Sequence, residues 1–413
     1  MKNDKKIDIV PFNSYQKFII AILAFLQFTI ILDFMVLSPL GAVLMPALQI
    51  GPAQFGLVVS AYAFSAGISG ILAAGFADRF DRKKMLLFFY AGFILGTLLC
   101  GLAPNYHFLL VARMVTGIFG GVIGSIVGAI TTDLFPFEMR GRVMGFVQTA
   151  FAASQILGLP AGLYFANLWG WNAPFLIIVL IGLLAGIVIV WKMKPVDSHL
   201  SLEAPTTAFH HLKTTVTNRT YLFAFASTAL LSIGGFMMMP FSSAFTVNNM
   251  KISLGNLPMI YLATGISSIF LGPIIGRLSD TVGKYKVFVV GSLISATTVF
   301  IYTNLGETAL VPVLILNVVM FSGIFSRMIP SVALMSAIPS PASRGSFMAI
   351  SASLQQIAGG FAAVLAGYIV VQNGKDAPLE HFDRVGYVMI GTVSISLVMM
   401  YFINKKVSQK KLS

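Results

Sequence analysis

AAGFADRFDRKKMLL (Ala73–Leu87) sets a dense cluster of charge between two long apolar segments. A related stretch, GRLSDTVGKYKVF (Gly276–Phe288), lies in the same kind of setting later in the chain. The two aspartates that align, Asp78 and Asp280, are 202 residues apart in a chain of 413 residues. The sequence therefore predicts a charged hairpin that occurs twice, once in each half of an otherwise apolar protein.

The composition around these hairpins indicates a membrane protein. Hydrophobic residues make up 57% of the chain and charged residues only 10%, which does not suit a soluble domain with a hydrated surface. Many segments run about 18 residues or more with at most one charge, enough for a helix to cross the hydrocarbon layer of a bilayer. The net charge of +13 lies mostly in short loops, so it indicates orientation in the membrane and we expect no nucleic-acid partner.

The apolar segments predict an all-α membrane protein with twelve transmembrane helices. Residues 194–219 form the longest internal polar segment and are expected to be a cytoplasmic linker between two six-helix bundles, residues 1–193 and 220–413. The twelve spans are expected near residues 18–41, 53–76, 85–103, 107–132, 143–167, 173–193, 220–246, 256–276, 287–304, 309–337, 347–371 and 385–404.

The positive charges of the loops predict the orientation. Most Lys and Arg residues lie at the two termini and in every second loop, whereas the opposite loops carry only Lys251, Lys375 and Arg384. Loops rich in Lys and Arg stay in the cytoplasm. We therefore expect a multi-pass protein of the plasma (inner) membrane with both termini in the cytoplasm.

A second pair of similar stretches supports an internal repeat. FEMRGRVMGF (Phe137–Phe146) returns as PASRGSFMAI (Pro341–Ile350), so that Arg140 aligns with Arg344 at an offset of 204 residues. Chance similarity between basic loops is the alternative. Two landmarks at nearly equal offsets favour two pseudo-symmetric bundles in parallel orientation, which suits transport by alternating access.

The hairpin resembles the G-x-L-a-D-r-x-G-r-k motif of the major facilitator superfamily, and the resemblance covers the whole chain. Ala74, Phe76 and Asp81 depart from that motif. Its charged positions are matched by Asp78, Arg79, Arg82 and Lys83, and the second copy keeps Gly276, Leu278, Asp280, Gly283 and Lys284.

The resemblance implies that the hairpin acts as a cytoplasmic latch. Asp78 at the end of the second span could pair with an Arg and cap a neighbouring helix, which would hold the halves in an outward-open state. The alternative is a plain basic anchor, as expected for Lys83 and Lys84. The predicted latch residues are Asp78, Arg79, Arg82, Gly276, Asp280 and Gly283.

Two further stretches resemble motifs of the same family. In the fourth span Arg113 and Gly117 match R-x-x-q-G, with Thr116 in place of the Gln, and the glycines that follow predict close packing with another helix. In the fifth span Gly158, Pro160 and Gly162 form a broken version of the motif that marks antiporters. Together with GWNAPF (Gly170–Phe175) this is similar to drug:proton antiporters of the arabinose-efflux-permease-like group, which favours export.

Asp33, Arg113 and Arg327 are the charged residues inside the predicted spans. Inserting a charged side chain at the centre of a membrane helix costs about 2.5–3.5 kcal/mol on insertion scales, so we predict a functional role for each of the three residues. Asp33 and Arg113 lie at similar depth in the first and fourth spans, which both line the central cavity in this family. A buried carboxyl favours its neutral form and a nearby Arg its charged form, so the pair could load and release a proton. A static structural ion pair is the alternative.

Candidate substrate contacts are harder to predict from the sequence. Arg327 could bind an anionic group or extend to the cytoplasmic interface. GGFMMMPFSS (Gly234–Ser243) could break the seventh span at a binding site, with core packing as the alternative. The candidate substrate-binding residues are Gln27, Thr116, Gln155, Met237, Met238, Arg327 and Gln355.

The chain carries no G-x-x-x-x-G-K-[ST] loop, no cluster of metal ligands and no nucleophile with a base, so we expect no enzyme, no cofactor and no metal. The leading hypothesis is a monomeric, proton-coupled exporter of a small amphipathic molecule, with the substrate, protons and the lipid bilayer as partners. A proton-coupled importer or uniporter of a metabolite is the alternative within transport. A membrane sensor that does not transport is the alternative from another class.

Overall fold

The computed structural model describes residues 11–73, 80–197, 200, 215, 217–340, 344–374 and 376–412. These residues form helices, and the one β-type pairing among them is an isolated bridge between Val371 and Glu380. The predicted all-α class is therefore confirmed.

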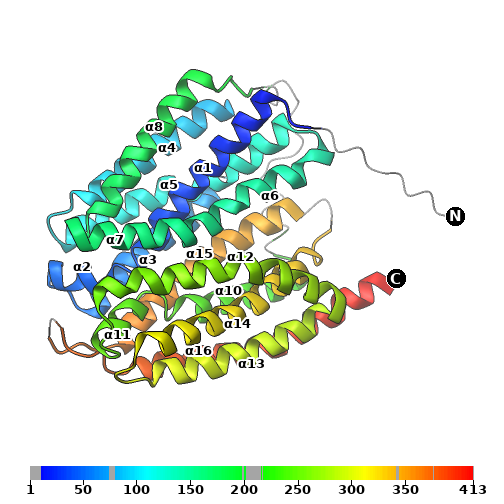
Figure 1. The fold of residues 1–413 in the computed structure, drawn as a ribbon. Helices are drawn as coiled ribbons and strands as arrows, with labels where there is room; N and C mark the ends of the chain where they lie inside the picture. Colours follow the sequence, from blue (N-terminus) through cyan, green and yellow to red (C-terminus); the bar gives the residue numbers. More distant parts are fainter. Residues whose placement is uncertain are drawn as a thin grey trace.

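The first half of the chain forms one bundle, which lies in the upper part of Figure 1. Its elements are α1 (Ser14–Val36), α2 (Gly41–Leu48), α3 (Pro52–Ala73), α4 (Arg82–Gly101), α5 (Tyr106–Leu134), α6 (Phe137–Ala153), the π-helix η2 (Ser154–Gly158), α7 (Leu159–Trp169) and α8 (Ala173–Lys192).

The second half forms the lower bundle in Figure 1. Its elements are α10 (Arg219–Phe236), α11 (Ser242–Asn248), the 3-10 helix η4 (Leu254–Asn256), α12 (Leu257–Val282), α13 (Lys284–Thr303), α14 (Leu310–Ser336), α15 (Arg344–Ile369) and α16 (Phe382–Leu412).

Short polar side chains fix where several helices begin. Asn13 and Gln16 form a reciprocal capping box at the start of α1, and the Asn105 side chain accepts a hydrogen bond from the Phe108 amide at the start of α5. Asn218 does the same at α10. Such caps satisfy amide groups that a first helical turn leaves unpaired.

Eleven helices in the described part of the chain are long and apolar enough to cross a membrane. The seventh predicted span, residues 220–246, is not among them: α10 has only 18 residues and ends at Phe236, before Pro240, and α11 begins at Ser242. The last helix is longer than predicted, since α16 continues to Leu412 rather than ending near residue 404.

The first predicted span, residues 18–41, is broken in the same way. α1 ends at Val36 and α2 begins at Gly41, whereas α10 ends at Phe236 and α11 begins at Ser242. The two breaks are thus 200 to 201 residues apart, close to the offset of the hairpins. The broken first and seventh spans are equivalent elements of two pseudo-symmetric bundles.

The start of α1 and the end of α16 lie on one side of the molecule, which we call the termini side; the opposite side, with the α1–α2 break, is the far side (Figure 1). Ser243 donates a hydrogen bond to the Ser38 carbonyl across the two bundles on the far side. The Asn167 side chain donates another to the Leu254 carbonyl. The bundles are therefore joined on the far side.

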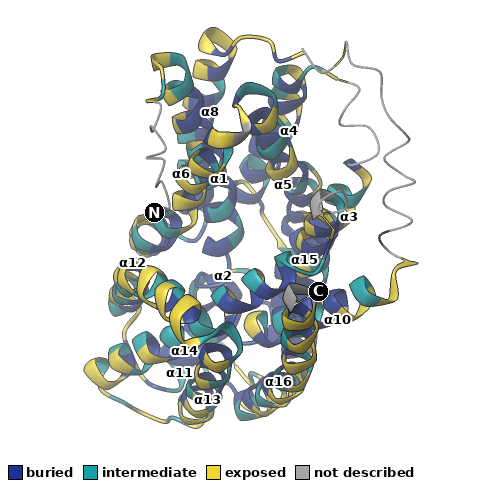
Figure 2. Cartoon of the chain, turned by 90° about the vertical axis from the view of Figure 1, so that its right-hand side faces the viewer, coloured by how far each residue is buried: buried dark blue, intermediate teal, exposed yellow. Residues whose placement is uncertain are grey.

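Helices α3 and α15 bring the bundles closest together, and they lie side by side in Figure 2, which looks onto the termini side. Glycines make this approach possible. A Cβ atom on Gly56 would lie 2.6 Å from the Ala363 carbonyl oxygen, and one on Gly67 would lie 2.8 Å from the Ser353 carbonyl oxygen. A larger residue at either position would push the two backbones apart.

Candidate functional site

An ion pair between Asp33 on α1 and Arg113 on α5 lies inside the N-terminal bundle. Arg113 Nη1 lies 2.8 Å from Asp33 Oδ2, and the two side chains are 1% and 0% exposed. The pairing that the sequence suggested is therefore present. Among the described residues, Asp33 is the only carboxylic acid that is buried.

Two side chains that the sequence did not mark complete the surroundings of this pair. Thr97 on α4 donates a hydrogen bond of 3.2 Å to Asp33 Oδ1 and shares its proton with the Phe93 carbonyl. The guanidinium carbon of Arg113 lies 4.6 Å from the centre of the Tyr62 ring on α3, a cation–π distance. Four helices thus hold the pair, while Arg113 Nε is buried with no hydrogen-bond partner.

On α5, Gly117, Gly121, Gly124 and Gly128 follow Arg113 along one face of the helix, and this glycine stripe packs against α3. A Cβ atom on Gly117 would lie 2.5 Å from the Tyr62 carbonyl oxygen, and one on Gly121 would meet the Ala66 carbonyl more closely still. Gly128, at the other end of the stripe, has no atom within 4 Å of such a Cβ. Close packing therefore explains the first part of the stripe and not its end.

The geometry limits what this pair can do in the observed conformation. Both charges are out of contact with solvent, so neither can exchange a proton with water here. Removing one partner of a buried ion pair typically costs about 3–5 kcal/mol, because the other charge is left uncompensated. Any titration of Asp33 requires a conformational change that separates it from Arg113 or admits water.

The π-helix η2 connects this pair to the C-terminal bundle. The Ser154 hydroxyl donates to the Phe28 carbonyl on α1, and a Cβ on Gly158 would lie 2.6 Å from Leu32, next to Asp33. On its other face, a Cβ on Gly265 of α12 would lie 2.9 Å from the Ile156 Cα atom. The glycines of the broken antiporter motif therefore seat η2 and α7 against α1.

The predicted latch is described only in part. Asp78 and Arg79 lie outside the described residues. Arg82 pairs with Asp133 at the end of α5, with 3.0 Å between Nε and Oδ2. The Arg82 amide also donates to the Val196 carbonyl. These contacts join α4 to the end of α5 and to the start of the predicted linker, and the sequence did not identify Asp133 as the partner.

The second copy of the hairpin makes a different set of contacts. Asp280 pairs with Lys284 at 2.8 Å, four residues on, and its side chain is 74% exposed. Gly283 has a φ of 111°, which explains why a glycine connects α12 to α13. Gly276 has open space around it. Arg82 and Lys284, which align at the offset of 202 residues, thus have different partners.

The predicted substrate residues of the N-terminal half do not gather at one place. Thr116 is fully buried between α4 and α5, where it donates to the Ala112 carbonyl and contacts Cys100 Sγ. Gln27 lies near Gly124 of α5. Gln155 lies on η2 at the contact with α12, and its buried Oε1 atom has no partner.

The predicted substrate residues of the C-terminal half are also dispersed. Met237 and Met238 form the break after α10 and are buried in the far-side core. Gln355 is exposed, one turn before Gly359, which lines a small space between the bundles. Arg327 is 5% exposed on α14, so it does not extend to the interface, the alternative that the sequence left open.

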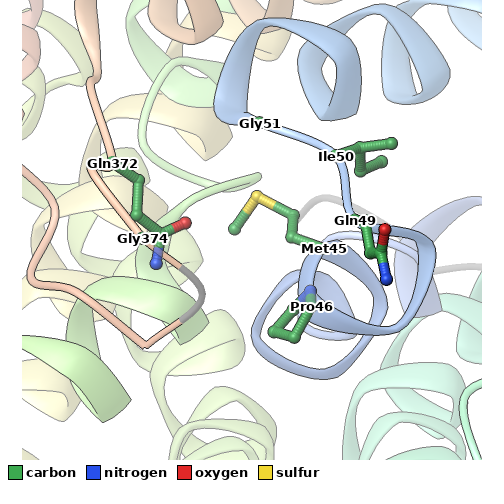
Figure 3. A pocket seen from close by; sticks show the side chains of 7 residues that line it. All are labelled: Met45, Pro46, Gln49, Ile50, Gly51, Gln372 and Gly374. Atoms are coloured by element: carbon green, nitrogen blue, oxygen red, sulfur yellow. The ribbon is translucent and has the colours of Figure 1, made fainter.

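Two spaces are lined by residues of both bundles. One, about 10 Å³, lies among Phe34, Phe236, Gly359 and other apolar residues, room for about one water molecule. A larger one, about 390 Å³, opens at the far surface and is drawn in Figure 3. The α2–α3 region lines it with Met45, Pro46, Gln49, Ile50 and Gly51, and the C-terminal half with Gln372 and Gly374.

Sequence comparison finds relatives among membrane transporters. The chain is 26% identical over 281 residues to the uncharacterized MFS-type transporter YceJ of Bacillus subtilis, covering 66% of this chain and 70% of that one. It is 31% identical over 137 residues to multidrug resistance protein fnx1 of Schizosaccharomyces pombe, covering 33% of this chain and 26% of that one.

Solved structures share the fold. A bacterial homologue of the human lysosomal transporter Spinster, crystallised in an inward-facing and occupied conformation, superposes with a TM-score of 0.77 at 14% identity, covering 96% of this chain and 98% of that one. The nucleoside transporter NupG, solved as a point mutant, gives a TM-score of 0.71 at 15% identity, covering 94% of this chain and 99% of that one. Both likenesses show the fold alone.

A family model decides the assignment. The model described as Major Facilitator Superfamily matches residues 23–363 and 224–413. As predicted, this makes the chain a multi-pass integral membrane transporter of small molecules rather than an enzyme. The chain therefore belongs to the Major Facilitator Superfamily.

Proposed function

We propose that this chain is a proton-coupled secondary active transporter that exports a small amphipathic molecule by alternating access. The observation that carries the proposal is the Asp33–Arg113 pair, since a buried carboxylic acid inside a membrane helix is a costly feature that transport of protons would explain. Asp33 takes up and releases the proton, and Arg113 stabilises its charged form.

The coupling follows from the change in separation between the two side chains. While Arg113 lies beside Asp33, the carboxylate is stabilised and no proton is bound. When α1 and α5 move apart while Asp33 stays largely out of water, the carboxylate loses that stabilisation and binds a proton. The π-helix η2 contacts both α1 and α12, so it is suited to pass movement of the C-terminal bundle to Asp33.

The far-side contacts support an inward-facing state for this conformation. The bundles meet through Ser38 and Ser243 on the far side. In the proposed orientation both termini are in the cytoplasm, so the far side faces outward and contact there closes the outward path. In the outward-facing state the hairpin residues Asp78, Arg79 and Arg82 would hold the cytoplasmic ends together. The hairpin thus acts as a latch that is released in the inward-facing state.

The direction of transport rests on two further observations. Gly158 and Gly162 of the antiporter-like motif pack against Leu32 and Val36, on either side of Asp33. The relative fnx1 is named a multidrug resistance protein, which favours export. Gln155 and Gln355 are the proposed polar contacts to substrate, because they lie near the surfaces where the two bundles face each other.

The proposal is tested with purified protein in proteoliposomes under an imposed pH gradient, with a panel of drugs, sugars and amphipathic acids. The wild-type chain is expected to accumulate a substrate in response to the gradient. Asp33→Asn is expected to lose the response to the gradient and to keep exchange of substrate down its own gradient.

Glu307→Gln provides the matched control, because it removes one carboxylate from an exposed position on the far side. It is expected to behave like the wild type. Substrate exchange by the wild-type chain without any proton movement would overturn the coupling and leave a uniporter. Full gradient-driven transport by Asp33→Asn would instead make the ion pair a static structural one.

A further inference from the structure

Arg327 is a buried cation with no counter-charge among the described residues. Its side chain is 5% exposed on α14, and its Nε and Nη2 atoms are buried with no hydrogen-bond partner. Arg113, the other charged Arg inside the predicted spans, has Asp33 at 2.8 Å. The two arginines therefore differ in whether the protein itself neutralises them.

The acidic residues of the C-terminal half do not compensate Arg327. They lie in the hairpin, in the far-side loops or at the start of α16, and none of those that the structure describes is buried. These acidic residues are Asp280, Glu307, Asp376, Glu380 and Asp383. A favourable contact comes from the ring of Phe288, whose centre lies 5.9 Å from the guanidinium carbon, close to the limit for a cation–π interaction.

The position of Arg327 along α14 excludes a simple role at the membrane interface. It lies nine residues before the end of α14 at Ser336, about 14 Å at the rise of an α-helix. An Arg that serves only to anchor a helix extends its head group into water. The head group of Arg327 does not reach water, although burying an uncompensated charge is costly.

The two unpaired nitrogens lie on the same edge of the guanidinium group. Nε–H and Nη2–H point side by side, which is the arrangement that binds the two oxygens of a planar anion. On the neighbouring helix α13, the Ser295 hydroxyl is also buried without a partner. Gly323 lies one turn before Arg327 on α14, and a Cβ atom added to it would lie 2.8 Å from the Ser295 amide nitrogen. Ser295 and Arg327 therefore belong to the same contact between α13 and α14.

We infer that Arg327 is the recognition site for a carboxylate group on the transported molecule. This inference rests on the proposed transport function and names its substrate class: an amphipathic monoanion whose carboxylate pairs with Nε and Nη2 while Phe288 contacts its apolar part. A monoanion matches one uncompensated positive charge. A dianionic phosphate would leave one negative charge buried without a partner.

The first test needs no knowledge of the substrate. In the ligand-free full chain, Arg327→Met removes an uncompensated charge and is expected to raise the midpoint of thermal unfolding in detergent. Arg113→Met, the matched control, removes one partner of an ion pair and is expected to lower that midpoint. A lower midpoint for Arg327→Met would show that Arg327 is satisfied within the protein, and would overturn the inference.

The second test measures equilibrium binding to the purified chain without a proton gradient. The probes are indole-3-acetate and 4-phenylbutyrate, each compared with its neutral primary amide. The wild-type chain is expected to bind the carboxylates at least tenfold more tightly than the amides. Arg327→Gln is expected to abolish this preference, and Arg327→Lys to restore only part of it, because Lys cannot bind both oxygens side by side.

The outcomes separate this inference from the proposed function. A carboxylate preference that depends on Arg327, in a chain that shows no proton coupling, supports the inference and overturns the coupling. Proton-coupled transport without any carboxylate preference, or a preference unchanged in Arg327→Gln, overturns the inference and leaves the coupling. Binding of inorganic phosphate but of neither carboxylate would also contradict the assignment.

Discussion

Neutralising Asp33 alone leaves Arg113 charged and fully buried, so its effect on stability is as informative as its effect on transport. Asp33→Asn is expected to lower the free energy of unfolding by about 3–5 kcal/mol, because the remaining charge has no counter-charge. The double variant Asp33→Asn/Arg113→Gln is expected to recover most of that loss. Thermal or denaturant unfolding in detergent measures both.

Such a loss of stability can itself reduce transport by Asp33→Asn. The double variant is therefore the better control for transport, since it lacks the proton carrier without an isolated buried charge. Equal stability of Asp33→Asn and the wild type would mean that Arg113 finds another partner when Asp33 is neutral.

The pairing of Asp33 with Arg113 could be predicted because a charge inside a bilayer must find a partner, and the chain offers few charges there. Thr97 and Tyr62 could not be predicted in the same way. A hydroxyl group or an aromatic ring is tolerated almost anywhere in a membrane helix, so neither stands out in the sequence. Their contacts become visible only when α3 and α4 are placed beside α5.

At the scale of the helices, the contact between α3 and α5 depends on glycine at particular positions. Gly121→Ala is expected to destabilise the protein by about 1–3 kcal/mol, because the new Cβ would collide with the Ala66 backbone carbonyl, which cannot move aside alone. Gly128→Ala is the matched control. It has open space and is expected to be neutral or stabilising by up to about 1 kcal/mol.

Thermal unfolding of the two variants in the same detergent checks this difference. Equal behaviour would mean that α3 and α5 are not in close contact in the membrane-embedded protein. The control also separates packing from helix propensity, since both variants replace Gly by Ala in the same helix.

Helix breaks show what the hydrophobic pattern does not contain. The apolar pattern predicted a continuous helix at residues 18–41 and, with a break as one option, at 220–246. Pro39 and Pro240 lie at the two breaks, and proline is a signal that a hydrophobic pattern leaves out. The π-helix η2 was not predicted either. One extra residue in a turn leaves the composition of a membrane helix unchanged, so only the backbone geometry reveals it.

At the scale of the whole molecule, transport by alternating access requires the far side to open. The double variant Ser38→Cys/Ser243→Cys places one thiol on each of two residues that already meet across the bundles, since the Ser243 hydroxyl lies 3.4 Å from the Ser38 backbone carbonyl. Oxidation is expected to join the bundles and to abolish transport, and a reductant is expected to restore it. Substrate flux in proteoliposomes before and after dithiothreitol measures the effect.

The two single-cysteine variants control for the substitutions themselves, and the buried Cys100 is common to all of them. Full transport by the cross-linked protein would contradict an alternating movement of the far side. The conformational state itself could not be predicted from the sequence, since one sequence must encode both states. The repeat and eleven of the twelve spans could be, because hairpins and span lengths follow directly from the spacing of charge and apolar residues.

The different surroundings of Arg113 and Arg327 have a consequence for energy conversion. Asp33 and Arg113 cancel each other, so the interior of the empty carrier keeps the single positive charge of Arg327. If a monoanion leaves the cell while one proton enters, two elementary charges move in the direction that an inside-negative voltage favours. At roughly 2.3 kcal/mol per charge for each 100 mV, a voltage of about 100 mV would contribute roughly 4.6 kcal/mol per cycle. The membrane voltage, as well as the pH difference, would then drive the export of substrate.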